Sequence, residues 1–246
     1  MNCERIREQI PEALAGRLEK AAREALVEHL EGCAGCRTEV AELNAAWRGL
    51  ETLKTGMDAA PETSAKVRFQ EMMAAYQAGM ASVQPAVRHQ RPLFHFFLHL
   101  TASRPASEDL VQEVFFRILK YRHTYQPEMS FRAWMFQIAR NVHLDHAGRR
   151  KGEVDLPDEA LELRGPEPLP DRQAQKNQEA VLLRRALAAL PREKREVLIM
   201  SRFHELKYEE IASVLQCEVG TVKVRVYRAM RDLSDRFFAL SGERAS

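Results

Sequence analysis

The amino-acid sequence predicts an all-α protein. Apolar residues recur at the i, i+3, i+4, i+7 spacing of one helix face in 69–76, 93–100 and 111–118. No stretch of useful length alternates apolar and polar residues as a half-buried strand does, and the sequence has no glycine-rich phosphate loop. Breaks in this pattern divide the 246 residues into several small helical domains. The breaks fall at 55–61, 82–89, 126–129 and 152–177.

Composition and sequence pattern favour a globular, cytoplasmic protein. The hydrophobic fraction of 45% is enough to build several cores. The longest apolar stretch, 92–100, is interrupted by His95 and His99 and is far shorter than a bilayer requires. Residues 1–20 alternate charges and lack the apolar core of a signal peptide. We therefore expect no membrane contact and a cytoplasmic location.

The charges are unevenly distributed, although the formal net charge is only +2. Residues 153–171 carry seven acidic residues and a single arginine, whereas 149–151 and the last helical segment are basic. Basic blocks on either side of an acidic, proline-containing linker indicate two modules that face nucleic acid on a flexible tether. The alternative is a solvated linker between unrelated helical domains.

The first helical segments contain a cluster of metal-ligand residues. His29, Cys33 and Cys36 have His-x3-Cys-x2-Cys spacing, which places all three on one face of a helix, and Cys3 would come from a preceding helix. One nitrogen and three sulfur ligands favour Zn²⁺, and four protein ligands leave no open position for catalysis. The sequence therefore predicts one structural zinc site. The alternative is a set of reduced, buried thiols in a small helical bundle.

The last helical segments predict a helix-turn-helix. Two apolar stripes are separated by residues 217–220, a segment too short for anything but a tight turn. Gly220 and Thr221 are suited to end this turn and to cap the next helix. The stripes are Tyr208, Ile211 and Leu215, then Val222, Val226, Ala229 and Leu233. The second helix carries basic residues and a tyrosine away from its stripe, which suits a DNA major groove. The alternative is an ordinary amphipathic helix pair with a solvated basic face.

Residues 1–40 resemble the zinc-binding anti-sigma domain, whose hallmark is the His-x3-Cys-x2-Cys motif with one further ligand about a helix hairpin upstream. Cys3 stands where that ligand is expected. In this family a later helix docks onto the sigma factor. The resemblance implies this docking role for one apolar stripe: Phe69, Met72, Met73 and Tyr76. Periodicity alone fits equally well a helix that packs on its own domain.

The rest of the chain resembles an extracytoplasmic-function sigma factor of bacterial RNA polymerase. Residues 92–151 resemble region 2 through SEDLVQEVFFRILKYR and SFRAWMFQIARNVHLDHAGRRK, and 179–238 resemble region 4 through its Leu-Pro, Tyr-Glu-Glu-Ile-Ala and Gly-Thr-Val-Lys landmarks. The resemblance implies that region 2 reads the −10 element and region 4 the −35 element. Residues 81–90 do not resemble the usual first helix of region 2, which predicts that this helix is truncated or replaced.

Matching positions imply three sets of contact residues. Contact with the RNA polymerase core is implied for Asp109, Gln112, Glu113 and Phe115. Contact with the −10 element is implied for Arg132, Trp134, Arg140, Asn141, Arg149 and Arg150, beside a loop at 121–129 that could hold a flipped base. Contact with the −35 element is implied for Lys223, Arg225, Tyr227 and Arg228. Trp134 is also a candidate core residue.

The predicted function is that of a sigma factor held inactive by a covalently joined zinc-binding anti-sigma domain. Its partners would be promoter DNA and the RNA polymerase core, with the anti-sigma to sigma contact made within one chain or between two chains. The alternative is a regulatory decoy whose sigma-like part no longer initiates transcription. No nucleophile stands beside a base at readable spacing, so we do not expect an enzyme.

These patterns together define a predicted domain order. A zinc-binding anti-sigma-like domain with its partner helix would span 1–80. A region 2-like domain would span 88–152, followed by an acidic flexible linker at 153–177. A region 4-like helix-turn-helix domain would span 178–240.

Overall fold

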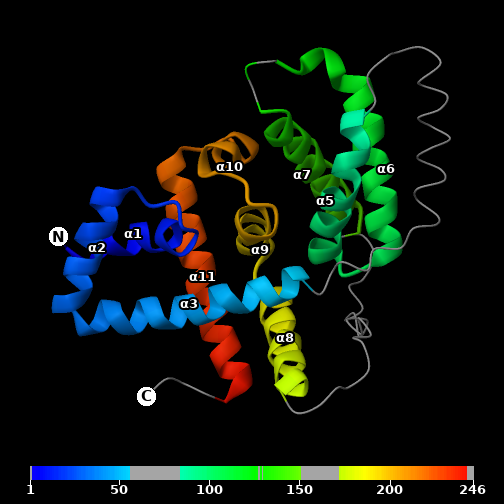
Figure 1. Cartoon of the computed structure of the whole chain (residues 1–246). Helices are drawn as coiled ribbons and strands as arrows, with labels where there is room; N and C mark the ends of the chain where they lie inside the picture. Colours follow the sequence, from blue (N-terminus) through cyan, green and yellow to red (C-terminus); the bar gives the residue numbers. More distant parts are fainter. Residues whose placement is uncertain (1, 56–83, 127, 129, 151–171, 243–246) are drawn as a thin grey trace. The chain divides into compact units, whose positions relative to one another are not determined.

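Helices make up the regular structure of the described residues, which confirms the all-α prediction. The computed structural model describes residues 2–55, 84–126, 128, 130–150 and 172–242. Their helices form two units (Figure 1). One unit contains the N-terminal helices α1–α3 and the C-terminal helices α8–α11, and the other contains the central helices α5–α7. None of the described helices is long and apolar enough to cross a membrane.

The N-terminal helices are α1 (Cys3–Leu14), α2 (Lys20–Gly32) and α3 (Ala34–Thr55). Helix α1 begins where the Asn2 side chain accepts a hydrogen bond from the Arg5 N–H at 3.0 Å. The chain leaves α1 through Gly16, whose φ of +70° is costly for residues with a side chain. A small core holds the three helices together. Its buried members are Ile6, Leu18, Leu26 and Cys36.

The C-terminal helices are α8 (Arg172–Ala188), α9 (Arg192–Leu198), α10 (Tyr208–Leu215) and α11 (Val219–Ser241). A single π-helical turn, η2 (Ile199–Phe203), continues α9. The apolar stripe predicted for the last helix is confirmed, because Val222, Val226, Ala229 and Leu233 are all fully buried. Residues 172–177, which the sequence had placed in a linker, are helical.

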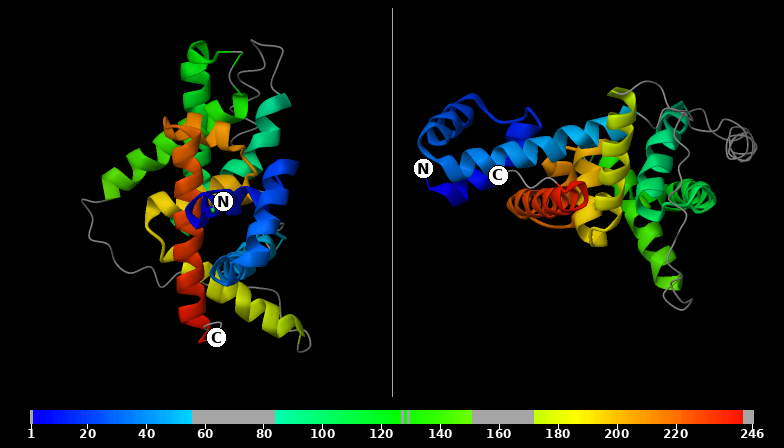
Figure 2. Two further views of the ribbon diagram at one scale, coloured as in Figure 1. Left: turned by 90° about the vertical axis from the view of Figure 1, so that its left-hand side faces the viewer. Right: turned by 90° about the horizontal axis from the view of Figure 1, so that it is seen from below.

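Helix α3 connects the two ends of the chain. Helices α1 and α3 both pack against α11, and α3 runs across it rather than along it (Figures 1 and 2). The C-terminal half of α3 buries an apolar face that packs against α8, η2 and α11. Its buried residues are Leu43, Ala46, Trp47, Leu50 and Leu53. Gly49 allows a close approach, since a Cβ at this position would lie 2.8 Å from Leu183 Cδ2 on α8.

The central unit contains α5 (Gln84–Thr101), α6 (Arg104–Tyr121), the 3-10 turn η1 (Arg122–Thr124) and α7 (Phe131–Arg150). Aromatic rings pack its core, with Phe96 in edge contact with both Phe97 and Phe136. The Ser103 side chain caps α6 by accepting a hydrogen bond from the Ala106 N–H. The predicted break at 82–89 is wrong over its described part, because α5 begins at Gln84.

Candidate metal centre and DNA-binding surfaces

The four predicted metal ligands meet in one place. One ligand atom from each of Cys3, His29, Cys33 and Cys36 can be chosen so that all four lie within 4.8 Å of one another. Cys3 begins α1, His29 lies in the last turn of α2, and Cys36 lies in the first turn of α3. The prediction that three ligands share one continuous helix face is wrong. Cys33 has extended geometry (φ −123°, ψ 103°) between α2 and α3, so the chain turns at the site itself.

The donor set fits a soft divalent cation. His29 Nε2 lies 3.4 Å from Cys36 Sγ, Cys3 Sγ lies 3.9 Å from Cys33 Sγ, and all three cysteines are free of disulfides. Burial raises the pKa of the Cys36 thiol to about 12, with the neighbouring thiols adding to this shift. The raised pKa means that the buried thiol favours its protonated form. A bound cation would instead favour the thiolate, because a coordinating thiol is deprotonated. One nitrogen and three sulfurs match the ligands of a structural zinc site.

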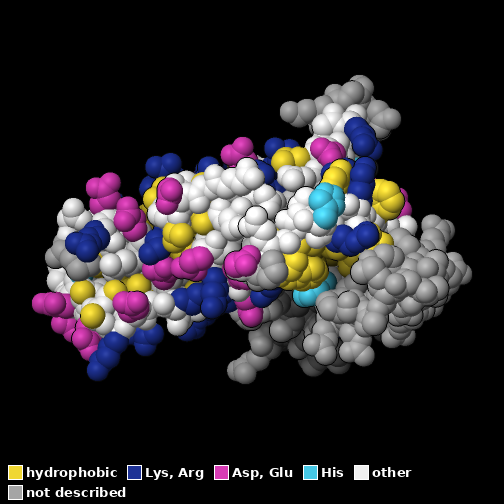
Figure 3. Space-filling view, turned by 90° about the horizontal axis from the view of Figure 1, so that it is seen from above, with side chains coloured by type: hydrophobic (Ala, Val, Ile, Leu, Met, Phe, Trp, Pro, Cys, Tyr) yellow, Lys and Arg dark blue, Asp and Glu magenta, His cyan; other side chains and the backbone are white. Residues whose placement is uncertain are grey.

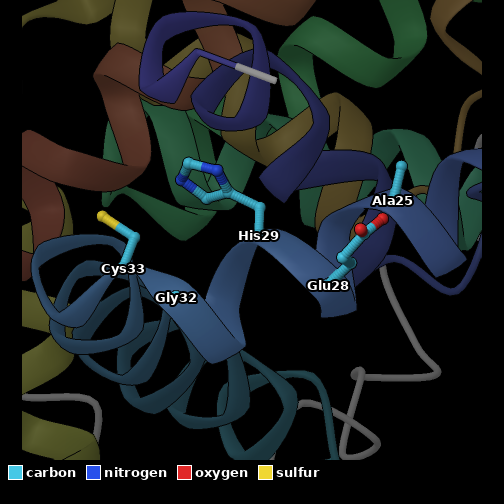
Figure 4. A pocket seen from close by; sticks show the side chains of 5 residues that line it. All are labelled: Ala25, Glu28, His29, Gly32 and Cys33. Carbon is cyan, nitrogen blue, oxygen red and sulfur yellow. The ribbon is translucent and has the colours of Figure 1, made fainter.

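A shallow pocket borders this centre. Its volume is about 380 Å³, and it is lined by residues from the second half of α2 and the following junction. The lining residues are Ala25, Glu28, His29, Gly32 and Cys33. Figure 4 shows the His29 and Cys33 side chains projecting toward the same side of α2. Solvent therefore reaches the edge of the candidate metal centre from this side.

The predicted helix-turn-helix is present, with a shifted turn. Helix α10 ends at Leu215 and α11 begins at Val219, so Gly220 and Thr221 lie inside the first turn of α11 rather than in the turn before it. Glu218 is the N-cap, and its side chain makes no capping hydrogen bond. The turn closes through Gln216, whose φ is +51°, and through the Cys217 N–H, which donates to the Ala212 carbonyl at 3.0 Å.

Two residues predicted to contact DNA are engaged by the N-terminal helices. Lys223 Nζ lies 3.1 Å from Glu12 Oε1 on α1. The Tyr227 hydroxyl donates a hydrogen bond to the Glu39 carboxylate on α3. The other oxygen of Glu39 accepts from Arg7 Nε at 2.8 Å, which fixes the carboxylate between the two donors. Burial, followed by the hydrogen bond to Glu39, raises the pKa of Tyr227 to about 12.

The other two residues of the predicted −35 set remain exposed. Arg225 and Arg228 are both exposed on α11. At 3.6 residues per turn, Lys223 and Tyr227 lie on one flank of the helix, and Arg225 and Arg228 lie toward the opposite flank. On the face shown in Figure 3, basic and acidic side chains are interspersed rather than gathered into patches of one sign. One flank of α11 is therefore covered and the other is open.

Two further contacts join the N-terminal and C-terminal helices, and neither was predicted from the sequence. The Arg17 guanidinium donates to the carbonyls of Leu206 at 2.8 Å and Glu205 at 3.1 Å, in the loop between η2 and α10. The Arg202 guanidinium stacks over the Trp47 ring, 4.5 Å from its centroid. Such contacts pair residues far apart in sequence, so no local spacing indicates them.

The predicted polymerase-contact residues on α6 differ in exposure. Asp109 is exposed, and Gln112 and Glu113 are partly exposed. Phe115 is only 3% exposed and packs in the core, so its ring cannot meet a partner there. The next residue, Phe116, presents its aromatic ring to solvent and is 55% exposed. Periodicity contained the signal, because Phe115 belongs to the apolar stripe of α6 and Phe116 does not.

The predicted −10 residues lie on α7 with mixed exposure. Asn141 and Arg149 are exposed, Arg132 and Arg140 are partly exposed, and the Arg150 side chain lies outside the described residues. Trp134 is 6% exposed, so it is a core residue. From the sequence it was a candidate for the core as well as for the −10 contact. It packs against two more accessible rings, with centroid distances of 5.2 Å to Tyr125 and 5.8 Å to Phe131.

A partly exposed charge network joins α6 to α7. The Arg117 guanidinium bonds to Glu113 and to Asp145, each at 2.7 Å, and its own side chain is only 21% exposed. The two carboxylates raise the pKa of Arg117 against the opposing effect of burial. This network fixes Glu113 relative to α7. The predicted docking stripe of Phe69, Met72, Met73 and Tyr76 lies outside the described residues.

Comparison with known proteins defines the class of the chain. Three family models match it: a zinc-finger model over residues 3–37, Sigma-70 region 2 over 86–153 and Sigma-70 region 4 over 180–233. The Sigma-70 matches coincide with the central helices and with α8–α11, and the zinc-finger match coincides with the four clustered ligands. The chain therefore combines two Sigma-70 regions with a zinc-finger segment.

Whole-sequence relatives identify the family more closely. The chain is 34% identical over 143 residues to the ECF RNA polymerase sigma factor EcfG of Rhodopseudomonas palustris, covering 56% of this chain and 75% of that protein. It is 31% identical over 173 residues to the ECF RNA polymerase sigma factor SigE of Mycolicibacterium smegmatis, covering 69% of this chain and 66% of that protein, just under two thirds of SigE's length. The chain belongs to the ECF sigma factor family.

A solved structure has a similar fold. It is a chain from the co-crystal structure of the sigma factor RpoE in complex with the anti-sigma factor NepR from Bartonella quintana. The match has a TM-score of 0.51 and 25% sequence identity, and it covers 65% of this chain and 95% of that chain. The predicted truncation of the first region 2 helix is not supported, because α5 forms from Gln84 and the region 2 match begins at residue 86.

Proposed function

We propose that this ECF sigma factor directs RNA polymerase to promoters and is held inactive by its own N-terminal zinc domain, α1–α3. The observation that carries the proposal is the engagement of Lys223 by Glu12 and of Tyr227 by Glu39. Both are predicted −35 contacts on α11, the recognition helix of region 4. A helix that reads bases needs its donors free for the groove, so carboxylates bound to these donors oppose DNA binding.

The apolar face of α3 supports the same proposal by anchoring the zinc domain to region 4. Leu50 and Leu53 are at most 1% exposed, and Trp47 is 4% exposed beneath Arg202. Burial of side chains of this size contributes about 1.5–3 kcal/mol each, which exceeds the value of about 0–1 kcal/mol expected for a partly exposed ion pair. The apolar contacts would hold the domain in place, and the polar contacts would occupy the DNA-reading side chains.

One Zn²⁺ bound by Cys3, His29, Cys33 and Cys36 would stabilise the zinc domain. The metal would supply a structural crosslink between the start of α1 and the junction of α2 with α3, without a catalytic role. Those two segments carry the residues that hold Tyr227, because Arg7 lies one turn after Cys3 and Glu39 lies one turn after Cys36. The metal site would therefore position the Arg7–Glu39 pair.

Region 2 would supply the polymerase contact and the −10 contact. For the polymerase core we propose Asp109, Gln112 and Glu113, with the exposed Phe116 in place of the buried Phe115. For the −10 element we propose the accessible polar residues of α7 together with the Tyr125 and Phe131 rings. The proposed polar residues are Arg132, Arg140, Asn141 and Arg149. Aromatic rings can stack an unpaired base for about 1–3 kcal/mol, which offsets the cost of unpairing it.

Run-off transcription with core RNA polymerase tests this proposal. The full chain is compared with a version that begins at Ser82, on a pool of bacterial promoter fragments. We expect the shortened chain to initiate transcription and the full chain to initiate much less. A tether of this kind gives an effective concentration on the order of millimolar, so a covalently joined domain can silence region 4 even with modest affinity.

A point variant provides the control for truncation. Leu50→Ala weakens the α3 contact while keeping the whole chain, whereas Arg48→Ala changes an exposed residue on the same helix. We expect Leu50→Ala to initiate more transcription than the parent chain but less than the shortened chain. We expect Arg48→Ala to initiate no more than the parent chain. Equal activity of the full and shortened chains would exclude inhibition by the zinc domain. If neither initiates at any promoter, the sigma-like part is a decoy.

A further inference from the structure

The coverage of the recognition helix α11 is one-sided, which separates two kinds of DNA contact. The Lys223 and Tyr227 flank faces carboxylates of α1 and α3, and the Arg225 and Arg228 flank is open. Positive charge on the open flank still attracts a polyanion. Lys223 and Tyr227 on the covered flank are not available to DNA until Glu12 and Glu39 move away.

We propose that the inhibited chain still binds duplex DNA without sequence preference, through the open arginine flank of α11. In this state the zinc domain prevents recognition of a DNA sequence but does not prevent binding to DNA. This inference rests on the proposed role of region 4 as a DNA-binding domain. Its partner is the sugar-phosphate backbone of a double helix, because an arginine guanidinium recognises phosphate oxygens through two parallel hydrogen bonds.

The physical consequence is a difference in counterion release along one helix. Each cation that meets a phosphate displaces condensed counterions, so the affinity for DNA falls with salt at a slope of about 0.9 per contact. An arginine on the open flank contributes to this slope in the full chain. Lys223 is already neutralised by Glu12 at 3.1 Å, so it contributes little until the zinc domain moves away.

Two substitutions on α11 form a matched pair for the test. Arg225→Gln and Lys223→Gln each remove one positive charge from the same helix, two residues apart. The probe is a fluorescent duplex of scrambled sequence without promoter elements, titrated with the full chain from about 50 to 200 mM salt. Thermal unfolding of each variant checks that its fold is retained.

The affinity of each protein for the duplex falls by some factor as salt rises over that range. We expect this factor to be about threefold smaller for Arg225→Gln than for the parent chain, and about tenfold smaller for Arg225→Gln/Arg228→Gln. We expect Lys223→Gln to leave the salt dependence unchanged. Removal of two charges outside α11, in Arg5→Ala/Arg48→Ala, controls for net charge. Both of these control residues are exposed on the N-terminal helices.

Three outcomes would overturn the inference. These are failure of the full chain to bind the scrambled duplex even at low salt, an unchanged salt slope in Arg225→Gln, and a salt slope lowered as much by Lys223→Gln as by Arg225→Gln. The assay contains no polymerase, so its result is independent of the transcription test. A full chain that transcribes freely would contradict the proposed inhibition, whereas an unchanged slope for Arg225→Gln would contradict only the open-flank contact.

Discussion

The N-terminal and C-terminal helices belong to one unit but are stabilised in different ways. The N-terminal helices share a core of four buried residues, and one of these, Cys36, is itself a candidate metal ligand. The C-terminal helices bury long apolar stretches, including 197–200 and the whole stripe of α11. A core as small as the first seldom holds a fold without a metal or a disulfide. The difference predicts that α1 and α2 can unfold while region 4 keeps its fold.

The largest effect is expected from breaking the metal centre with Cys36→Ser. Structural zinc contributes apparent binding free energies of about 10–16 kcal/mol in zinc-finger peptides, and much of this is folding free energy. We expect the bound zinc to fall from one ion per chain to none, and α1 and α2 to lose amide protection while α9 and α11 keep theirs. Metal analysis and hydrogen exchange under reducing conditions measure both quantities.

Cys217→Ser is the matched control for Cys36→Ser. Cys217 is a free cysteine in the helix-turn-helix turn, away from the four clustered ligands. We expect Cys217→Ser to keep its zinc. A full zinc content in Cys36→Ser would show that the ligand assignment is wrong. Loss of protection throughout α8–α11 would contradict the independence of region 4 from the metal.

A smaller effect is expected from Leu50→Ala, which alters the contact between the two sets of helices. Leu50 is completely buried on α3, and truncation of a buried leucine to alanine costs about 2–5 kcal/mol. We expect the C-terminal half of α3 to lose amide protection while the metal centre keeps its zinc. Exchange rates equal to those of Arg48→Ala, the exposed control on the same helix, would show that α3 does not depend on this contact.

The smallest effect is expected from Tyr227→Phe, which removes the hydrogen bond to Glu39. The bond is partly exposed, so we expect a loss of about 1 kcal/mol at neutral pH. Folding raises the pKa of Tyr227 to about 12, above its ordinary value of about 10. The contribution of the neutral phenol is therefore fully present below about pH 10 and is lost as the pH rises toward 12.

The alkaline part of this prediction is measured as a difference between two proteins. The free energy of unfolding is compared for the parent chain and Tyr227→Phe at about pH 8 and about pH 11, on either side of the ordinary tyrosine pKa. We expect the difference in free energy of unfolding between the two proteins to be smaller at the higher pH. Tyr121→Phe, at an exposed tyrosine of the central unit, is measured beside it as the control. A difference that grows with pH would contradict the role of the neutral phenol.

The sequence predicted the parts of the candidate sites that depend on local spacing. The ligand cluster follows from His-x3-Cys-x2-Cys and an upstream cysteine, and the structure places those four residues together. The stripe of α11 follows from helical periodicity, and its residues are buried. Local errors arose where periodicity could not locate a chain turn. The junction at Cys33 interrupts the expected helix face, and the turn before α11 ends at Glu218 rather than at Gly220.

By itself the sequence determined the helical class, the metal donors and the residues that resemble two sigma regions, because each depends on neighbours only a few positions apart. Only the tertiary structure decided that Glu12 and Glu39 reach Lys223 and Tyr227 and that Arg17 binds the loop before α10. These three contacts join residues about 190 to 210 positions apart in the sequence. Such contacts form because packing of α3 against region 4 brings the two ends together, and no local spacing records that packing.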